Sequence, residues 1–267
     1  MMSRWLPPIA SEHGARIDGS LVWVHWLMAV LFVGWILFFG YCLWRFRRSR
    51  NPVADHAGVQ SHASSWLEGG VAVAEAVLLI GLAVPLWADR VNEFPAEKDA
   101  VVVRVVAEQF AWNVHYPGPD GLFGRRDNTK IDLQSNPLGL DRADEAAKDD
   151  VTTVNQLHLP VGKPVIVHLS SKDVIHSFNV PEFRIKQDAV PGIDIPVWWV
   201  PTVTTAQMRQ RLGKPEFVYE IACAQLCGIT HASMRGFVTI HEPAAFQTWL
   251  DEQVAAAQST GEEGFWN

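Results

Sequence analysis

The chain has 267 residues, of which 48% are apolar, and it carries a formal net charge of −7. This length allows one sizeable domain with additional elements, and the negative charge argues against nucleic acid as a partner. Three cysteines are too few to build a disulfide framework. Cys42 lies in an apolar run and is expected to serve packing, whereas Cys223 and Cys227 stand close to a His and a Met.

Two apolar runs predict a transmembrane hairpin in residues 1–92. The run Leu21–Trp44 has 24 residues and contains no Asp, Glu, Lys or Arg, and a helix needs about 20 apolar residues to cross a bilayer. The run Gly69–Trp87 is also long enough, although it contains one acid. We therefore expect membrane-spanning helices over about residues 21–46 and 66–88.

The connection between the two runs is basic, which predicts its side of the membrane. Basic connections stay in the cytoplasm, so both termini are expected on the periplasmic or outer side of the cytoplasmic membrane. An acid inside a bilayer usually faces protein or water. Glu75 therefore predicts contact with another membrane protein or a hydrogen bond between the two helices. The basic residues are Arg45, Arg47, Arg48 and Arg50.

Residues 93–267 are predicted to form an all-β domain. Short stretches rich in β-branched and aromatic residues alternate with Gly- and Pro-rich turns, which is typical of a β-sandwich or barrel. A polar stretch over 121–150 predicts a surface insertion, and apolar residues at a spacing of four predict a helix over 243–258. The expected strands are Val101–Val106, Val151–Leu159, Val165–Leu169, Pro196–Val200, Glu216–Ile221 and Gly236–Ile240.

A short segment, which we call the metal loop (residues 223–234), concentrates metal ligands. It reads Cys223-Ala-Gln-Leu-Cys227-Gly-Ile-Thr-His231-Ala-Ser-Met234. Thiolate, imidazole and thioether together are the ligands of a soft metal, above all copper. Zinc seldom takes Met, and iron–sulfur clusters usually need four cysteines. A disulfide between the two cysteines is the alternative.

The number of cysteines in the metal loop distinguishes between two kinds of copper site. A mononuclear blue-copper site needs one Cys, two His and a weak Met. Two thiolates on one tight loop can instead bridge two copper ions, each of which then needs one imidazole and one weak outer ligand. The loop supplies His231 and Met234, and the backbone carbonyl of Gln225 could be the remaining weak ligand.

The second imidazole must come from elsewhere in the fold. The segment Asp173-Val-Ile-His176-Ser-Phe, just before a turn at Pro181, is the best source. Two of the other histidines alternate within predicted strands, where they are more often surface or satisfied core residues. These other candidates are His115, His158, His168 and His241.

Over nearly its whole length the chain resembles subunit II of the haem–copper cytochrome c oxidases, in a divergent form. The resemblance rests on the metal loop, on Asp173-Val-Ile-His176-Ser-Phe and on Lys186-Gln-Asp-Ala-Val-Pro-Gly192. It implies a two-helix transmembrane hairpin followed by an all-β cupredoxin-like domain, a Greek-key sandwich or barrel, with a C-terminal helix.

The resemblance also implies a cofactor and partners. The cofactor is a pair of copper ions, the dinuclear copper A centre, which takes electrons from cytochrome c. Subunit I would receive these electrons at its haem and reduce O2 to water with proton translocation, and subunit III is a further expected partner. The donor should be a separate protein, because no Cys-x-x-Cys-His motif for covalent haem occurs. The implied copper ligands are His176, Cys223, Gln225 through its backbone, Cys227, His231 and Met234.

Three positions depart from the family pattern. Gln225 stands where most members have a Glu that reaches magnesium, and an amide is a poor magnesium ligand, so we do not expect the magnesium site. Phe110 stands where a Trp usually receives electrons from cytochrome c. Phe110 or nearby Trp112 could take that role, and core packing is the alternative for both. Ile193 stands where an Arg often follows Pro-Gly.

Two acids match family positions with known roles. Glu68 corresponds to a Glu associated with proton uptake from the cytoplasm, and Asp173 corresponds to a residue that helps to dock cytochrome c. A solvated acid at the interface or surface is the alternative for each.

Three other functions compete with the oxidase interpretation. Nitrous oxide reductase uses the same copper loop but is far larger and soluble, and quinol oxidase subunit II keeps the fold but has lost the copper ligands. A membrane-anchored copper carrier or assembly protein is the third alternative, and it would need an exposed, exchangeable site.

Overall fold

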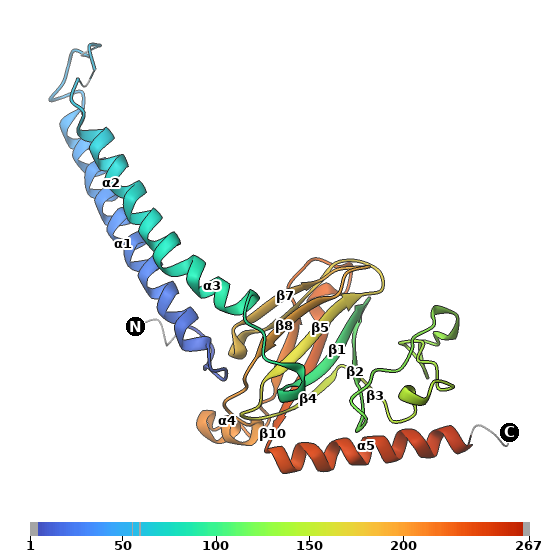
Figure 1. The fold of residues 1–267 in the computed structure, drawn as a ribbon. Helices are drawn as coiled ribbons and strands as arrows, with labels where there is room; N and C mark the ends of the chain where they lie inside the picture. Colours follow the sequence, from blue (N-terminus) through green and yellow to red (C-terminus); the bar gives the residue numbers. More distant parts are fainter. Residues whose placement is uncertain (1–4, 55, 59, 264–267) are drawn as a thin grey trace. The chain divides into compact units, whose positions relative to one another are not determined.

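The structure of the protein, a computed structural model, describes residues 5–54, 56–58 and 60–263. These residues form two units (Figure 1). The helical unit comprises residues 15–93, and the β unit comprises residues 5–14 together with the chain from Phe94 onward.

The helical unit contains two long apolar helices. The first is α1 (Gly14–Arg45), and the second consists of α2 (Ala63–Leu78), a π-helical turn (Leu79–Ala83) and α3 (Val84–Val91). Both are long and apolar enough to cross a membrane, with a mean hydropathy of 2.2. The π-helical turn ends two residues before Pro85, which lacks the N–H that a regular α-helix would use there. The two helices fit a membrane-anchored protein.

The β unit is a sandwich of two five-stranded sheets with orders β3-β2-β1-β5-β8 and β4-β10-β9-β6-β7. Most neighbours are antiparallel, but β1 pairs with β5, and β4 with β10, in parallel. The strands are β1 (Val101–Glu108), β2 (Ala111–Tyr116), β3 (Val151–Val154), β4 (Gln156–Pro160), β5 (Val165–Ser171), β6 (His176–Val180), β7 (Ile185–Ala189), β8 (Ile195–Trp199), β9 (Tyr219–Cys223) and β10 (Arg235–His241).

Two α-helices and several 3-10 turns complete the β unit. Helix α4 (Thr205–Leu212) begins with a capping box between Thr204 and Gln207, and α5 (Pro243–Glu263) contacts β3, β4 and β10. The 3-10 turns are Glu97–Asp99, Asn128–Lys130, Glu145–Ala147, Pro181–Phe183 and His231–Ser233. The predicted fold class, a helical hairpin plus an all-β cupredoxin-like sandwich with a C-terminal helix, is confirmed.

One predicted strand is interrupted in the structure. Val151–Leu159 was expected as a single strand, but Asn155 has φ of +58° and separates β3 from β4. The two halves join different sheets, so the chain crosses the sandwich at this residue. The Asn155 side chain accepts a hydrogen bond from the Trp112 backbone N–H at 2.8 Å, which fixes the crossing next to β2.

The chain before α1 also packs on the β unit. Ser11 forms a bridge with Pro201, and its hydroxyl donates to the Phe183 carbonyl at 2.7 Å. Ala10 is completely buried. Residues 5–14 therefore belong with the sandwich, whereas the expected boundary at residue 92 placed them with the helices.

Aromatic residues fill the space between the sheets. Trp112, Phe178, Phe183, Trp199 and Tyr219 are completely buried, and several pairs of their rings meet edge-on or stacked. Each large buried side chain stabilises the fold by about 1.5–3 kcal/mol relative to an exposed one. This packed core gives the strands that flank it little freedom to move.

The C-terminal helix is held against the sandwich by three stacked rings. His158 of β4 lies on Trp249 of α5 with ring centroids 4.1 Å apart, and its Nδ1 is 2.8 Å from Nε2 of His241. Burial, with a smaller contribution from His241, lowers the pKa of His158 to about 4. The contact therefore requires a neutral imidazole at position 158.

Acid should weaken the packing of this helix. The unfolded His158 binds a proton near pH 6.5, but the folded one does so only near pH 4, so protonation favours the unfolded chain within that window. The free energy of unfolding should fall as pH drops from 6.5 to 4, by on the order of 1 kcal/mol after solvent screening. Urea denaturation of the detergent-solubilised chain at several pH values measures this.

A variant comparison isolates the contribution of this imidazole from that of other acid-sensitive groups. His158→Gln should flatten the pH dependence relative to the parent chain, whereas His56→Gln, in an exposed loop, should leave it unchanged. Parallel curves for the parent and His158→Gln would contradict the assignment.

Candidate metal centre

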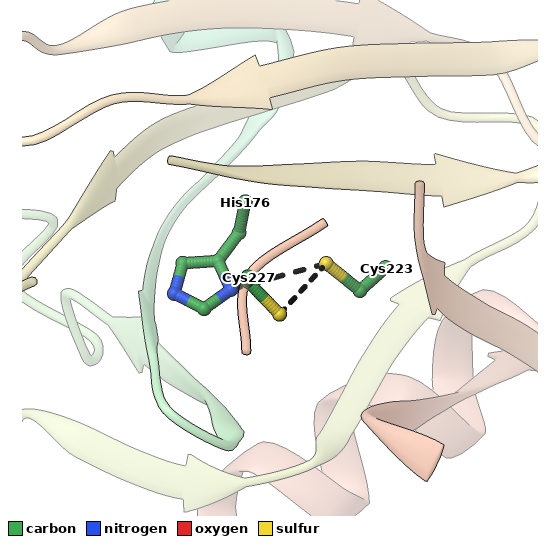
Figure 2. A group of neighbouring side chains, drawn as sticks. All are labelled: His176, Cys223 and Cys227. Atoms are coloured by element: carbon green, nitrogen blue, oxygen red, sulfur yellow. Dashed lines mark hydrogen bonds between the residues drawn. The ribbon is translucent and has the colours of Figure 1, made fainter. Parts of the chain in front are cut away.

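Three candidate ligands lie close together, as Figure 2 shows: His176 and Cys223 from the ends of β6 and β9, and Cys227 from the loop after β9. Ligand atoms of His176, Cys223 and Cys227 all lie within 4.8 Å of one another. The two Sγ atoms are 3.7 Å apart, and Cys223 Sγ is 3.8 Å from His176 Nδ1. Both cysteines are free, so the alternative of a disulfide is not realised here.

Strand pairing places these residues together. His176 opens β6 and Cys223 closes β9, and the two strands are antiparallel with Phe178 opposite Cys223. The Ala224 N–H donates to the Ser177 carbonyl at 3.0 Å, which extends the pairing into the metal loop. The imidazole is therefore beside the first sulfur because of the sheet register.

The other three predicted ligands surround the two sulfurs. Cys227 Sγ is 3.6 Å from His231 Nδ1 and 3.8 Å from Met234 Sδ. The Gln225 backbone oxygen is 3.2 Å from Cys223 Sγ. The structure thus brings all six predicted ligands together, with one imidazole near each sulfur.

The Cys227 thiol is poorly placed to ionise without a cation. Cys227 is 4% exposed, and burial, followed by the hydrogen bond with Cys223, raises the pKa of Cys227 to about 11. Two adjacent thiolates in such a place repel each other, and a bound metal removes both costs. The soft donor set of sulfur and imidazole fits copper.

Asp173 orients the buried imidazole. His176 is completely buried, and its Nε2 lies 2.9 Å from Asp173 Oδ1. A proton on Nε2 donates to this carboxylate and leaves the Nδ1 lone pair directed at the sulfurs. The pattern Asp-x-x-His carried this signal in the sequence, but only a docking role was predicted for Asp173. The docking role stays a prediction.

Gln109 connects this network to the metal loop, and sequence reasoning missed it. Its backbone N–H donates to Asp173 Oδ2 at 2.7 Å, and its side-chain amide donates to the Cys227 carbonyl at 2.5 Å. No ligand-type side chain marks this position, so the sequence offered no signal. The residue joins the two segments that hold the sulfurs and the imidazole.

The two aromatic residues proposed for electron acceptance occupy different environments. Trp112 is completely buried, and its ring meets His176 edge-on with centroids 6.2 Å apart. Phe110 is half-buried and lies against the metal loop at Gly228. Phe110 is therefore the one closer to the surface.

The remaining candidates lie away from the sulfurs. His115 pairs with buried Asp150 at 2.7 Å, His168 pairs with Asp194 at 3.0 Å, and the other two histidines pair with each other. Glu68 and Glu75 are exposed residues of α2 in the helical unit, and their roles stay predictions.

Comparisons with known proteins agree with this geometry. The sequence profile of the family described as "Cytochrome C oxidase subunit II, periplasmic domain" matches residues 101–240. A relative from Bradyrhizobium diazoefficiens, "Alternative cytochrome c oxidase subunit 2", is 36% identical over 259 residues, which cover 96% of this chain and 87% of the relative. "Cytochrome c oxidase subunit 2" of Cereibacter sphaeroides is 27% identical over 86% of this chain and 75% of its own.

Solved structures include a similar domain. The periplasmic domain of subunit II of cytochrome oxidase (CoxB) of Bradyrhizobium japonicum is 25% identical, with a TM-score of 0.41, over 60% of this chain and 96% of that one.

These findings define a membrane-anchored, copper-binding protein with a cupredoxin-like fold. The chain belongs to the cytochrome c oxidase subunit II family. It is accordingly a subunit of a haem–copper oxidase complex, which is an oxidoreductase, and other oxidase subunits are its partners.

Gly228 should be necessary for the metal loop to close on Gln109. Its φ is +137°, and an added Cβ would lie 2.8 Å from Gln109 Nε2 and 3.0 Å from Phe110 Cζ. Gly228→Ala should displace the contacts that orient the ligands and weaken copper binding about tenfold. Competition with a copper chelator measures the affinity.

Gly162→Ala is the matched control for this substitution. Gly162 also has a positive φ, of +74°, but an added Cβ there meets nothing within 4 Å. Gly162→Ala should keep the copper affinity of the parent chain, and an unchanged affinity in Gly228→Ala would contradict the role given to its contact with Gln109.

Proposed function

We propose that the metal loop and His176 bind two copper ions as a dinuclear copper A centre. The observation that carries this proposal is the pair of free sulfurs 3.7 Å apart, each with its own imidazole within 3.8 Å. A mononuclear site would use one sulfur and leave the second without a role. Met234 and the Gln225 carbonyl are the weak outer ligands.

When bound, the copper pair would hold one transferable electron. The chain supports electron transfer by holding the ligand side chains in fixed positions. His176 is fixed by Asp173, Cys223 by the strand register, and Cys227 through the Gln109 amide. A site whose ligands are already in place reorganises little when its charge changes, which favours fast electron transfer.

In the oxidase complex, the chain would accept electrons from a cytochrome c and pass them to haem in subunit I. Subunit I would reduce O2 to water with proton translocation, and subunit III is a further proposed partner. The Arg-rich connection between the helices supports an inner-membrane location with both termini and the β unit on the periplasmic or outer side. The lipid bilayer surrounds the two helices.

Four residues have proposed accessory roles. Phe110, which is half-buried beside the metal loop, would receive electrons from the donor, and Trp112 would act behind it, edge-on to His176. Asp173 would both orient His176 and present negative charge to cytochrome c. Glu68 would take up protons from the cytoplasmic side.

Two features argue against a magnesium site and against a role as a copper carrier. Gln225 offers an amide where magnesium prefers a carboxylate, so we propose no magnesium ion. A copper carrier or assembly protein needs an exchangeable, exposed site, but His176, Cys227 and Met234 are each less than 5% exposed. Burial of these three ligands favours permanent copper over transfer.

The number of metal nuclei tests the proposal. The detergent-solubilised full chain, loaded with copper, should bind two ions, and in its mixed-valence form one unpaired electron should couple to two copper nuclei in electron paramagnetic resonance. Cys227→Ser should abolish the shared-electron signal, because one bridging sulfur is lost. Met234→Leu should shift the reduction potential but keep both ions.

Cys42→Ser serves as the control, since Cys42 lies in α1 outside the β unit. This variant should retain two coppers and the shared-electron signal. A parent chain that binds one copper with a single-nucleus pattern would refute the dinuclear assignment.

A further inference from the structure

A second site lies on the outer face of the other sheet. A cavity of about 910 Å³ is formed between this sheet, the insertion and the turn before β8. Its floor comes from β1 and β5, where Arg104 stands opposite His168 in the parallel register and Val106 opposite Ser170. This volume is within the range of small-molecule sites.

The lining of the cavity is strongly basic, although the whole chain is acidic. Four permanently charged cations line it, but among the described lining residues only Asp194 is a carboxylate, and it pairs with His168 at 3.0 Å. The cations are Arg104, Arg125, Arg126 and Lys172.

Two of the four cations have ion-pair partners and two do not. Arg125 pairs with Asp141 at 2.7 Å, and Lys172 pairs with Glu108 at 2.6 Å. Within the part of the chain that the structure describes, neither Arg104 nor Arg126 forms an ion pair. The cavity therefore holds two guanidinium groups whose charge no carboxylate balances directly.

Arg104 is held in place in a way that leaves its donors available. Its guanidinium carbon lies 4.0 Å from the centroid of the Phe123 ring, which comes from the insertion. Stacking on a ring uses the flat face of the guanidinium and leaves its N–H groups at the edge free to bind oxygen atoms. Burial, followed by the nearby Arg126, lowers the pKa of Arg104, while Asp194 and Asp150 act in the opposite direction without forming an ion pair with it.

The insertion that closes the cavity is anchored from beneath. His115 of β2 and Asp150 at the end of the insertion form a completely buried pair, and the Gly124 N–H donates to the same Asp150 oxygen at 2.8 Å. Phe123 packs edge-on against His115 with centroids 5.0 Å apart. These contacts fix the wall that carries Phe123 and the neighbouring arginines.

We propose that this cavity binds a small oxyanion with two or more negative charges, a phosphate-type or dicarboxylate ligand. Arg104 and Arg126 donate to its oxygen atoms, because guanidinium groups match the geometry of both phosphate and carboxylate. This site contains none of the copper ligands, so the proposal of anion binding does not depend on the proposed electron-transfer role.

Calorimetric titration of the detergent-solubilised full chain tests the proposal, with inorganic phosphate, pyrophosphate and malonate as the probes. We expect saturable binding of at least one probe, and the rank order of the three distinguishes phosphate from carboxylate chemistry. Arg104→Gln and Arg126→Gln should each weaken binding about tenfold or more, since a hydrogen bond to a charged group is lost.

Arg211→Gln is the matched control, because it removes the same charge from an exposed position on α4, outside the cavity. It should change the affinity less than twofold, and circular dichroism should show every variant folded. Arg126 is exposed, so its variant tests the site even if Arg104→Gln does not fold. No saturable binding of any probe, or equal weakening in all three variants, would overturn the proposal.

Discussion

The antiparallel pairing of β6 with β9 is the constraint on which the metal centre depends. It places Phe178 opposite Cys223, and so puts the first residue of one strand beside the last residue of the other. A slip of one residue would turn His176 and Cys223 to opposite faces of the sheet. Phe178 of β6 and Tyr219 of β9 are completely buried, and they oppose such a slip because the strand that moved would turn its aromatic ring out of the core. The chemistry at the end of the sandwich thus depends on packing within it.

The sequence could point to the candidate metal centre because four of the six proposed ligands are side chains at fixed short spacing in the metal loop. A fifth is a backbone carbonyl between them, and the sixth is a His in a recognisable segment. It did not predict Gln109, since an amide that donates to a backbone carbonyl has no pattern of its own. Asp173 was seen as a surface acid, although its carboxylate meets Nε2 of the buried imidazole. The two contacts of Gln109 join residues more than sixty positions apart, and only the folded chain brings them together.

The fold shows the same division between local and long-range information. Long apolar helices and several strands were predictable, but β2, β7 and α4 were missed because each is short and carries polar residues. The strand expected over 151–159 ends at Asn155, whose left-handed backbone conformation moves the chain from one sheet to the other. The sequence pattern does not show this crossing, because residues typical of strands continue on both sides of Asn155. The cavity beneath the insertion was not predictable from the sequence either, because its two arginines without an ion pair come from a strand and a loop.

The central claim is that the fold holds two thiolates as a shared bridge between two metal ions. A crystal structure of the copper-loaded full chain, with anomalous scattering measured at the copper absorption edge, tests this most directly. The account predicts two copper peaks between the Cys223 and Cys227 sulfurs, with the His176 and His231 imidazoles on different ions. A single peak, or a bond between the two sulfurs with copper elsewhere, would contradict it.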